Sequence, residues 1–231
     1  MTTDKIYDPL PEGSQPKYKT AGYFRTGTLA PGGQMPPLRT LTELTGPRFE
    51  APPPVDQNLV AGVDGLAIGQ LIRIVVRVVD EDDRPQPGAL IELWQANAAG
   101  KYQHPVDQRK APIDGNFRSW GRGLADDKGE VVFLTIRPGA YPVPNTDGWW
   151  RPPHIHISAY GSSFVSRLVT QVYFPGDPLN ELDAILQGVP DPKARERLML
   201  VPDESVGLHE EALGYRFDLV LRGRAATPLE N

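Results

Sequence analysis

Short apolar runs, each ended by glycine, proline or aspartate, recur from residue 71 to the end of the chain. They are rich in β-branched and aromatic residues, which is typical of strands in a half-buried sheet. The first run, LIRIVVRVV, places Arg73 and Arg77 on one face and ends in four consecutive acidic residues. We predict strands over residues Leu71–Val79, Ala89–Gln95, Gly129–Ile136, His154–Tyr160, Arg167–Phe174 and Tyr215–Leu221. The pattern indicates an all-β fold, a β-sandwich with a few short helices, one of them within residues 191–200.

Residues 1–60 follow a different pattern, rich in proline and poorly periodic. Only Leu38–Leu44 suggests a helix in this part of the chain. The segment also contains aromatic residues, which disordered tails usually lack: Tyr18, Tyr23, Phe24 and Phe49. We therefore expect residues 1–60 to form an ordered arm that packs on the core or on a partner subunit, and residues 61–231 to form one catalytic domain.

Composition narrows the function classes. The chain has 231 residues, 25 prolines and 23 glycines, which favours short strands and ordered loops over long helices. Its net charge of −5 argues against a nucleic-acid or anionic-membrane partner. No stretch is apolar enough to span a membrane, and no signal peptide is evident, so we expect a cytoplasmic enzyme. The absence of cysteine leaves His, Asp, Glu and Tyr as candidate metal ligands.

The segment around His154 and His156 holds the most specific chemistry. Residues i and i+2 of a strand share a face, so the two imidazoles form half of a possible metal site. Two of the four histidines of the chain lie here, beside Arg151 and a tryptophan pair. Tyr102 lies further upstream, in a loop where a strand breaks, and a lone tyrosine there is more often a core or surface aromatic than a ligand. His104 and His209 need no function, since solvated loop positions explain both.

Several long stretches together resemble the intradiol ring-cleavage dioxygenases, and in particular the β chains of members that cleave protocatechuate. The similar stretches are WQANAAGKY, TIRPGAYPVPN, WRPPHIH, TQVYFPGDP, YRFDLVLRG, and, near the N-terminus, PKYKT and TGPRF. The resemblance implies that one non-haem Fe³⁺ is bound by Tyr102, Tyr141, His154 and His156. It also implies O₂ and a catechol, preferentially protocatechuate, as substrates, and a homologous α chain as partner in a higher oligomer.

Charge balance agrees with that ligand set. One Fe³⁺, two phenolates and one hydroxide sum to zero, and two neutral imidazoles complete a buried site that needs no counter-ion. Zinc or Fe²⁺ would leave a surplus negative charge. In the family, the tyrosine matching Tyr141 is displaced by the substrate and takes up one of its two protons. The ring then opens between the hydroxyl-bearing carbons and yields a carboxy-cis,cis-muconate.

The resemblance also implies roles for residues around the ion. Arg151 matches an arginine that stabilises negative charge on the substrate, so with Tyr141 it is a candidate catalytic residue. Tyr18, Val143 and Gln171 match positions that line the substrate pocket. Val143 departs from the family pattern, because well-known β chains carry tryptophan there.

The wider pocket expected at Val143 keeps alternatives open. One is an intradiol dioxygenase for another substituted catechol, such as a sulfocatechol. The alternatives from other classes are a metal-free β-sandwich binding module and a zinc hydrolase that uses the His-Ile-His pair. The presence of all four family ligands argues against the last two.

Overall fold

The computed structural model describes residues 55–62, 64–160 and 167–229. It contains two four-stranded sheets and a separate two-stranded hairpin. One sheet has the order β4 (Glu130–Ile136), β1 (Leu71–Val79), β10 (Leu213–Val220), β9 (Val201–Pro202). The other has the order β3 (Trp120–Leu124), β2 (Leu90–Trp94), β7 (His154–Tyr160), β8 (Arg167–Tyr173). The predicted all-β class is confirmed.

The two sheets face each other across an apolar core. On β1 the alternate residues Ile72, Ile74, Val76 and Val78 are fully buried, as period-2 patterning requires. The facing sheet contributes buried side chains such as Ile155 and Ile157 of β7. Side chains of both sheets interdigitate in one core, which is the sandwich arrangement.

Short helices and turns complete the described part of the chain. The helical elements are η2 (Pro178–Leu182), α2 (Ala184–Gln187), α3 (Pro192–Glu196) and η3 (Glu204–Val206). The helix predicted within residues 191–200 is α3, with Asp191 as its N-cap. No helix in the described ranges is long and apolar enough to cross a membrane.

The predicted strands agree with the observed ones to within two residues at each end, and β1 and β7 match in full. Strand β3 was missed because its sequence, WGRGL, contains two glycines and little apolar character. Those glycines allow close packing, since a Cβ at Gly121 would lie 2.6 Å from the carbonyl oxygen of Asp56. The predicted arm over residues 1–60, including its helix and Tyr18, falls almost wholly outside the described residues.

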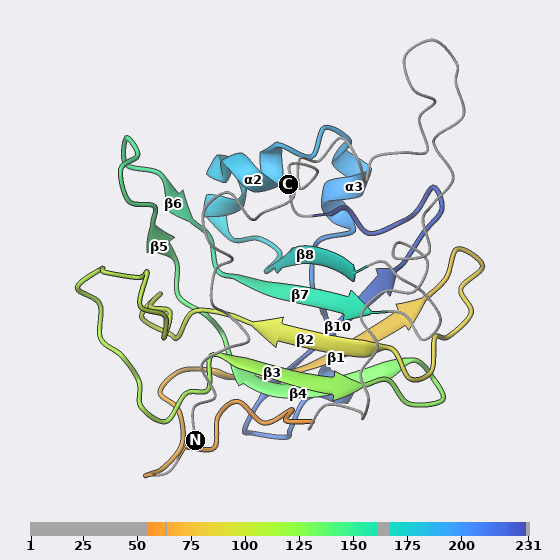
Figure 1. The fold of residues 1–231 in the computed structure, drawn as a ribbon, viewed down its shortest axis with the longest axis horizontal. Coiled ribbons are helices and arrows are strands. Elements are labelled where there is room, and N and C mark those ends of the chain that lie inside the picture. Colours follow the sequence, from red (N-terminus) through yellow and green to blue (C-terminus); the bar gives the residue numbers. More distant parts are fainter. Residues whose placement is uncertain (1–54, 63, 161–166, 230–231) are drawn as a thin grey trace, which may run out of the picture. The chain divides into compact units, whose positions relative to one another are not determined.

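The ends of several elements gather at one side of the sandwich (Figure 1). There β2 ends, β7 begins, and the hairpin of β5 (Tyr141–Pro142) and β6 (Trp150–Arg151) stands beside them. The long loop that joins β2 to β3 also leaves from this side. All candidate site residues in the described ranges come from these elements or from the neighbouring strand β8.

Candidate metal centre

His154 and His156 lie on the face of β7 that points away from the core. Their cross-strand neighbours on β8 are Tyr173 and Gln171, respectively. On the other side, Trp94 of β2 pairs with His156, and their rings stack at 4.9 Å with only 7° between the planes. The alternation therefore presents both imidazoles on one polar and aromatic surface, while Ile155 between them is buried in the core.

His154 is held in one tautomer by its surroundings. Its Nδ1 lies 2.7 Å from the carbonyl oxygen of Pro152, and a carbonyl can only accept, so Nδ1 carries the proton. Nε2 is left as the basic nitrogen. Burial, with further contributions from His156 and Arg151, holds the pKa of His154 well below its usual value. The imidazole is therefore neutral, the form that binds a metal.

Tyr141 points at that basic nitrogen. Its hydroxyl lies 3.3 Å from Nε2 of His154 and donates to it. Burial raises the pKa of Tyr141, although Arg151 and a hydrogen bond with Tyr102 act in the opposite direction. Without a cation nearby, the phenol keeps its proton, and a bound cation would favour the phenolate.

The backbone around Gly100 brings Tyr102 close to Tyr141. Gly100 has φ +72°, and a Cβ there would lie 2.3 Å from the carbonyl oxygen of Ala140. Gly139 approaches the same turn, and its N–H donates to the carbonyl of Asn97 at 2.9 Å. Because only glycine permits such an approach, the two segments that carry the tyrosines touch through their main chains.

Four aromatic rings with donor atoms form a closed set of neighbours. The ring centroids are 5.6 Å apart for Tyr102 and Tyr141, and 5.4 Å for Tyr141 and His154. They are 5.1 Å apart for His154 and His156, and 6.3 Å for His156 and Tyr102. The four residues come from three separate segments, so the fold itself assembles the predicted set.

The donor chemistry fits one hard cation. In the described ranges, no three His, Asp or Glu side chains gather closely enough to hold a metal, so the tyrosines are the anionic donors available beside the two histidines. The 3.3 Å between the Tyr141 oxygen and Nε2 of His154 also fits two ligands of one ion, which typically lie about 3 Å apart.

Arg151 lies beside this set and is fixed by an ion pair. Its Nε donates to Asp183 Oδ1 at 2.8 Å and its Nη2 to Oδ2 at 3.2 Å. Nη2 also donates to Gln171 Oε1 and, at 3.2 Å, to the hydroxyl of Tyr173. Burial would lower the pKa of Arg151, but the contacts with Asp183 outweigh it and raise the pKa. The site therefore contains a guanidinium that is oriented by three side chains and paired with the buried carboxylate of Asp183.

Gln171 lies on β8 beside His156, and Val143 lies next to β5. Gln171 is buried, its Oε1 is engaged by Arg151, and its Nε2 has no partner among the described residues. Val143 extends the β5–β6 pairing, donating its N–H to Trp149 at 2.9 Å, and lies two residues from Tyr141 on the same side of the hairpin. Tyr18 lies outside the described residues, and His209 is exposed, as expected.

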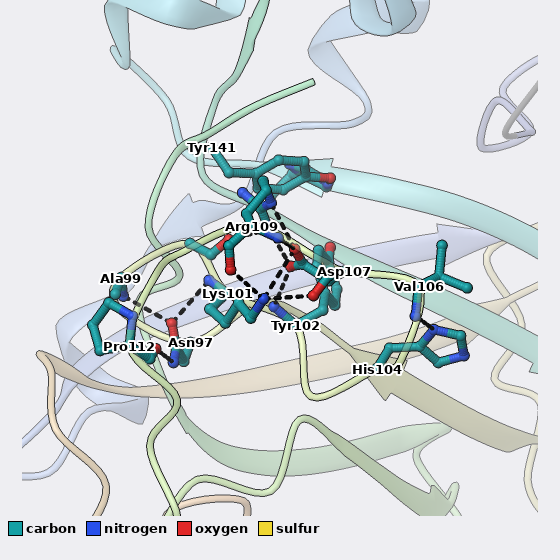
Figure 2. A network of polar contacts seen from close by, with 12 residues as sticks. Asn97, Ala99, Lys101, Tyr102, His104, Val106, Asp107, Arg109, Pro112 and Tyr141 are labelled. Atoms are coloured by element: carbon teal, nitrogen blue, oxygen red, sulfur yellow. Dashed lines mark hydrogen bonds and ion pairs between the residues drawn. The ribbon is translucent and has the colours of Figure 1, made fainter. Parts of the chain in front are cut away.

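Residues near the tyrosines that the sequence did not single out form a partly buried polar network (Figure 2). Lys101, Asp107 and Arg109 tie the loop after β2 together, and Figure 2 shows Arg109 against the ring of Tyr141. Asp183, the partner of Arg151, was also missed. Acidic and basic residues in loops are ordinarily solvated. The only available signal was that Lys101, Asp107 and Arg109 lie close to Tyr102 in the sequence.

Comparison with known proteins places these residues in a wider context. A family model described as Dioxygenase matches residues 44–223. The protocatechuate 3,4-dioxygenase beta chain of Burkholderia cepacia is 45% identical over 237 aligned positions, which cover 100% of each chain. The protocatechuate 3,4-dioxygenase alpha chain of Pseudomonas putida is 31% identical, covering 70% of this chain and 76% of its own.

A solved structure gives the same picture of the fold. The dioxygenase domain of a dioxygenase carbohydrate-binding protein fusion from Streptomyces sp. SirexAA-E superimposes with a TM-score of 0.53 at 28% identity. The match covers 77% of this chain and 94% of that domain.

Proposed function

The chain belongs to the intradiol ring-cleavage dioxygenase family, and we propose that it cleaves protocatechuate with O₂ between the two hydroxyl-bearing carbons. The product is a carboxy-cis,cis-muconate. The observation that carries the proposal is the closed set of two tyrosines and two histidines, with the Tyr141 hydroxyl 3.3 Å from Nε2 of His154. Whole-chain similarity to a protocatechuate 3,4-dioxygenase beta chain supports the choice of substrate.

The cofactor of this family is iron, and we propose that Tyr102, Tyr141, His154 and His156 hold one non-haem ferric ion. Two phenolates and a hydroxide balance its charge, and two neutral imidazoles complete the set. When bound, ferric iron would supply Lewis-acid chemistry: it would favour loss of the catechol protons and make the ring susceptible to attack by O₂. The neutral tautomer enforced on His154 supplies one ligand without any change of protonation state.

Tyr141 is proposed to accept one of the protons that the catechol loses. Burial favours the neutral phenol at this position and raises its pKa. The phenolate oxygen of Tyr141 would therefore be a good acceptor for a proton from the catechol. His154 remains in place because its Nδ1–H is bonded to Pro152. In this proposal Tyr141 accepts a proton, whereas His154 keeps its position as a ligand.

Arg151 is proposed to stabilise the negative charge of the bound substrate. Arg151 is 4% exposed, and Asp183, Gln171 and Tyr173 all contact its guanidinium. A preorganised charge in a site of low polarity stabilises developing charge more than a mobile one does, since it needs no reorganisation. The buried amide Nε2 of Gln171 is available as an additional donor beside it.

We further propose that the active assembly contains a homologous α chain. The similarity to an alpha chain of the same enzyme class, with 31% identity, supports two related subunits with a common fold. The aromatic residues of the N-terminal 60 positions fit a contact with such a partner. The catalytic domain of residues 61–231 then supplies the four ligands.

An alternative substrate is a differently substituted catechol, such as a sulfocatechol, and Val143 is the residue that favours it. Where related β chains carry tryptophan, valine leaves more room beside the ring of the substrate. Arg151 provides a positive charge that suits either a carboxylate or a sulfonate.

The test is a product assay on the chain produced together with a homologous α chain and loaded with iron. Protocatechuate supplied with ¹⁸O₂ should yield carboxy-cis,cis-muconate that carries both labelled atoms, and Tyr102→Phe should lower turnover. A preference for 4-sulfocatechol in kcat/KM would select the alternative. No oxygen consumption with either catechol would overturn the proposed activity.

A further inference from the structure

Three charged side chains of the loop after β2, one buried and two half-buried, lie together beside the two tyrosines. The exposed fractions are 7% for the side chain of Lys101, 8% for Asp107 and 16% for Arg109. Lys101 Nζ lies 3.3 Å from Asp107 Oδ1 and donates to the carbonyl of Arg109 at 2.6 Å. Removing charged groups from water costs desolvation free energy, which pairing only partly offsets. The fold therefore keeps this cluster together at a cost in desolvation free energy.

Asp107 connects the cluster to Tyr102. Its Oδ2 accepts the backbone N–H of Tyr102 at 3.0 Å, and its Oδ1 accepts the backbone N–H of Arg109 at 3.1 Å. One carboxylate thus closes the loop on itself and fixes the main chain from which the Tyr102 ring projects. Burial alone would raise the pKa of Asp107, but hydrogen bonds from Arg109, Tyr102 and Lys101 outweigh it and hold the pKa well below its usual value.

Arg109 connects the same cluster to Tyr141. Its guanidinium carbon lies 4.5 Å from the centre of the Tyr141 ring, over the ring face. Its Nε donates to Asp107 Oδ1 at 2.8 Å and its Nη2 to the carbonyl of Gly100 at 2.6 Å. A guanidinium over an aromatic face is attractive, and more so when it is desolvated and cannot move.

We propose that Asp107 and Arg109 act as one positioning unit that holds both tyrosine rings in the arrangement needed to bind iron. The inference rests on the proposed iron-dependent function and adds two positioning residues to it. Asp107 sets the main chain of Tyr102 and the orientation of Arg109, and Arg109 holds Tyr141 through the face of its ring. Asp107 holds Tyr102 at its main-chain N–H and Arg109 lies over the ring of Tyr141, so both residues act through the tyrosines.

The charge of the cluster fits this role better than a purely structural one. A buried carboxylate needs one cation to balance it, whereas Asp107 has two, Lys101 and Arg109. The cluster therefore carries one excess positive charge, and that charge lies over the electron-rich ring of Tyr141. A phenolate ring binds such a cation more strongly than a phenol ring does.

The test compares iron affinity in Arg109→Met, Arg109→Lys, Asp107→Asn and the double variant Asp107→Asn/Arg109→Met. Arg222→Met is the matched control, since Arg222 forms an exposed ion pair with Glu81 outside the site. Each full-length variant is produced with the homologous α chain, and iron affinity is measured by chelator competition, followed through the visible absorption band. Unfolding midpoints of the iron-free proteins are recorded in parallel.

We expect Arg109→Met to lose about 10- to 100-fold in iron affinity, the usual effect of removing a residue that orients a metal ligand. Arg109→Lys, which restores the charge without the forked hydrogen bonds, should fall between wild type and Arg109→Met. The double variant should be no weaker than the weaker single variant, because the two residues act as one unit.

Three results would overturn the positioning role. The first is an iron affinity of Arg109→Met within twofold of that of the Arg222→Met control. The second is a loss of iron affinity in the double variant that equals the product of the two single losses. The third is equal iron affinity and equal unfolding midpoints for Arg109→Met and Arg109→Lys. The last would mean that the charge is irrelevant. Wild-type protein that binds no iron would instead contradict the proposed function, so the two failures are distinguishable.

Discussion

The hydroxyl of Tyr141 donates to Nε2 of His154 across 3.3 Å, although thirteen residues separate them in the chain. The hairpin of β5 and β6 returns the chain so that Tyr141 lies opposite Arg151, three residues before His154. Because Nδ1 of His154 donates its proton in a hydrogen bond to the carbonyl of Pro152, Nε2 presents a lone pair to the phenol. The two donor atoms that we propose as metal ligands therefore already face each other in the folded chain.

Acidification should destabilise the iron-free protein through His154. The folded pKa of His154 lies well below the ordinary value of 6.5, so below about pH 6.5 the unfolded chain binds a proton that the folded protein does not. The contribution of neutral His154 to the free energy of unfolding is fully present above that pH. It decreases as the pH falls, by up to about 1.4 kcal/mol per pH unit. Urea midpoints at pH 7.5 and 5.5 measure it.

The matched variant is His154→Asn, whose amide can replace the Nδ1 donor without titrating. Its urea midpoint should change less between the two pH values than that of the wild type. An equal change in both proteins would mean that His154 does not cause the acid sensitivity.

Substitution of Gly100 should disrupt the site through the backbone. Gly100→Ala adds a Cβ at φ +72° and 2.3 Å from the carbonyl oxygen of Ala140, so the Tyr102 loop must move away from Tyr141. The expected cost is more than about 1 kcal/mol of stability, with weaker iron binding. Gly88→Ala is the control, since it has a similar φ of +73° but no neighbour within 4 Å. Equal iron binding by the two variants would contradict the close-approach argument.

Arg151→Lys should lower catalytic efficiency while iron binding is retained. Lysine keeps the charge but cannot reproduce the two-pronged contact with Asp183, so the charge is no longer fixed. Loss of a charged hydrogen bond of about 1.5–3 kcal/mol corresponds to a roughly 10- to 100-fold decrease in kcat/KM. Steady-state kinetics and iron analysis on the same preparation check both parts. Unchanged kcat/KM would remove Arg151 from the proposed mechanism.

The strands and the histidine pair were predictable because each depends on local sequence. β-Branched runs defined β1 and β7, and the i, i+2 rule placed His154 and His156 on one face. The link between Arg151 and Asp183, 32 residues apart, was not predictable from the residues, because nothing local distinguishes Asp183 from a solvated aspartate. Strand β3 was missed because its local sequence is misleading. Its glycines suggest a loop, but in the structure they allow close packing. The roles of Tyr102 and Tyr141 came from family resemblance alone.

Val143→Trp should narrow the pocket and shift substrate preference. A buried tryptophan adds a large contact surface, on the order of 150–250 Å² for an aromatic side chain, against the substrate ring. Protocatechuate binding should improve by on the order of 1–3 kcal/mol, while catechols with larger 4-substituents should bind less well. The ratio of kcat/KM for protocatechuate to that for 4-sulfocatechol is the measured quantity. If tryptophan leaves the ratio unchanged, Val143 does not set the width of the pocket.

The visible absorption spectrum of the protein, recorded with its iron content, tests the proposed centre most directly. With one ferric ion per site, phenolate-to-iron charge transfer should give a broad visible band and a red-brown solution. Tyr102→Phe and Tyr141→Phe should each shift or weaken the band, whereas Tyr160→Phe, at the far end of β7, should leave it unchanged. A colourless protein that binds one equivalent of zinc and opens no catechol would contradict the assignment of Tyr102, Tyr141, His154 and His156 to a ferric site.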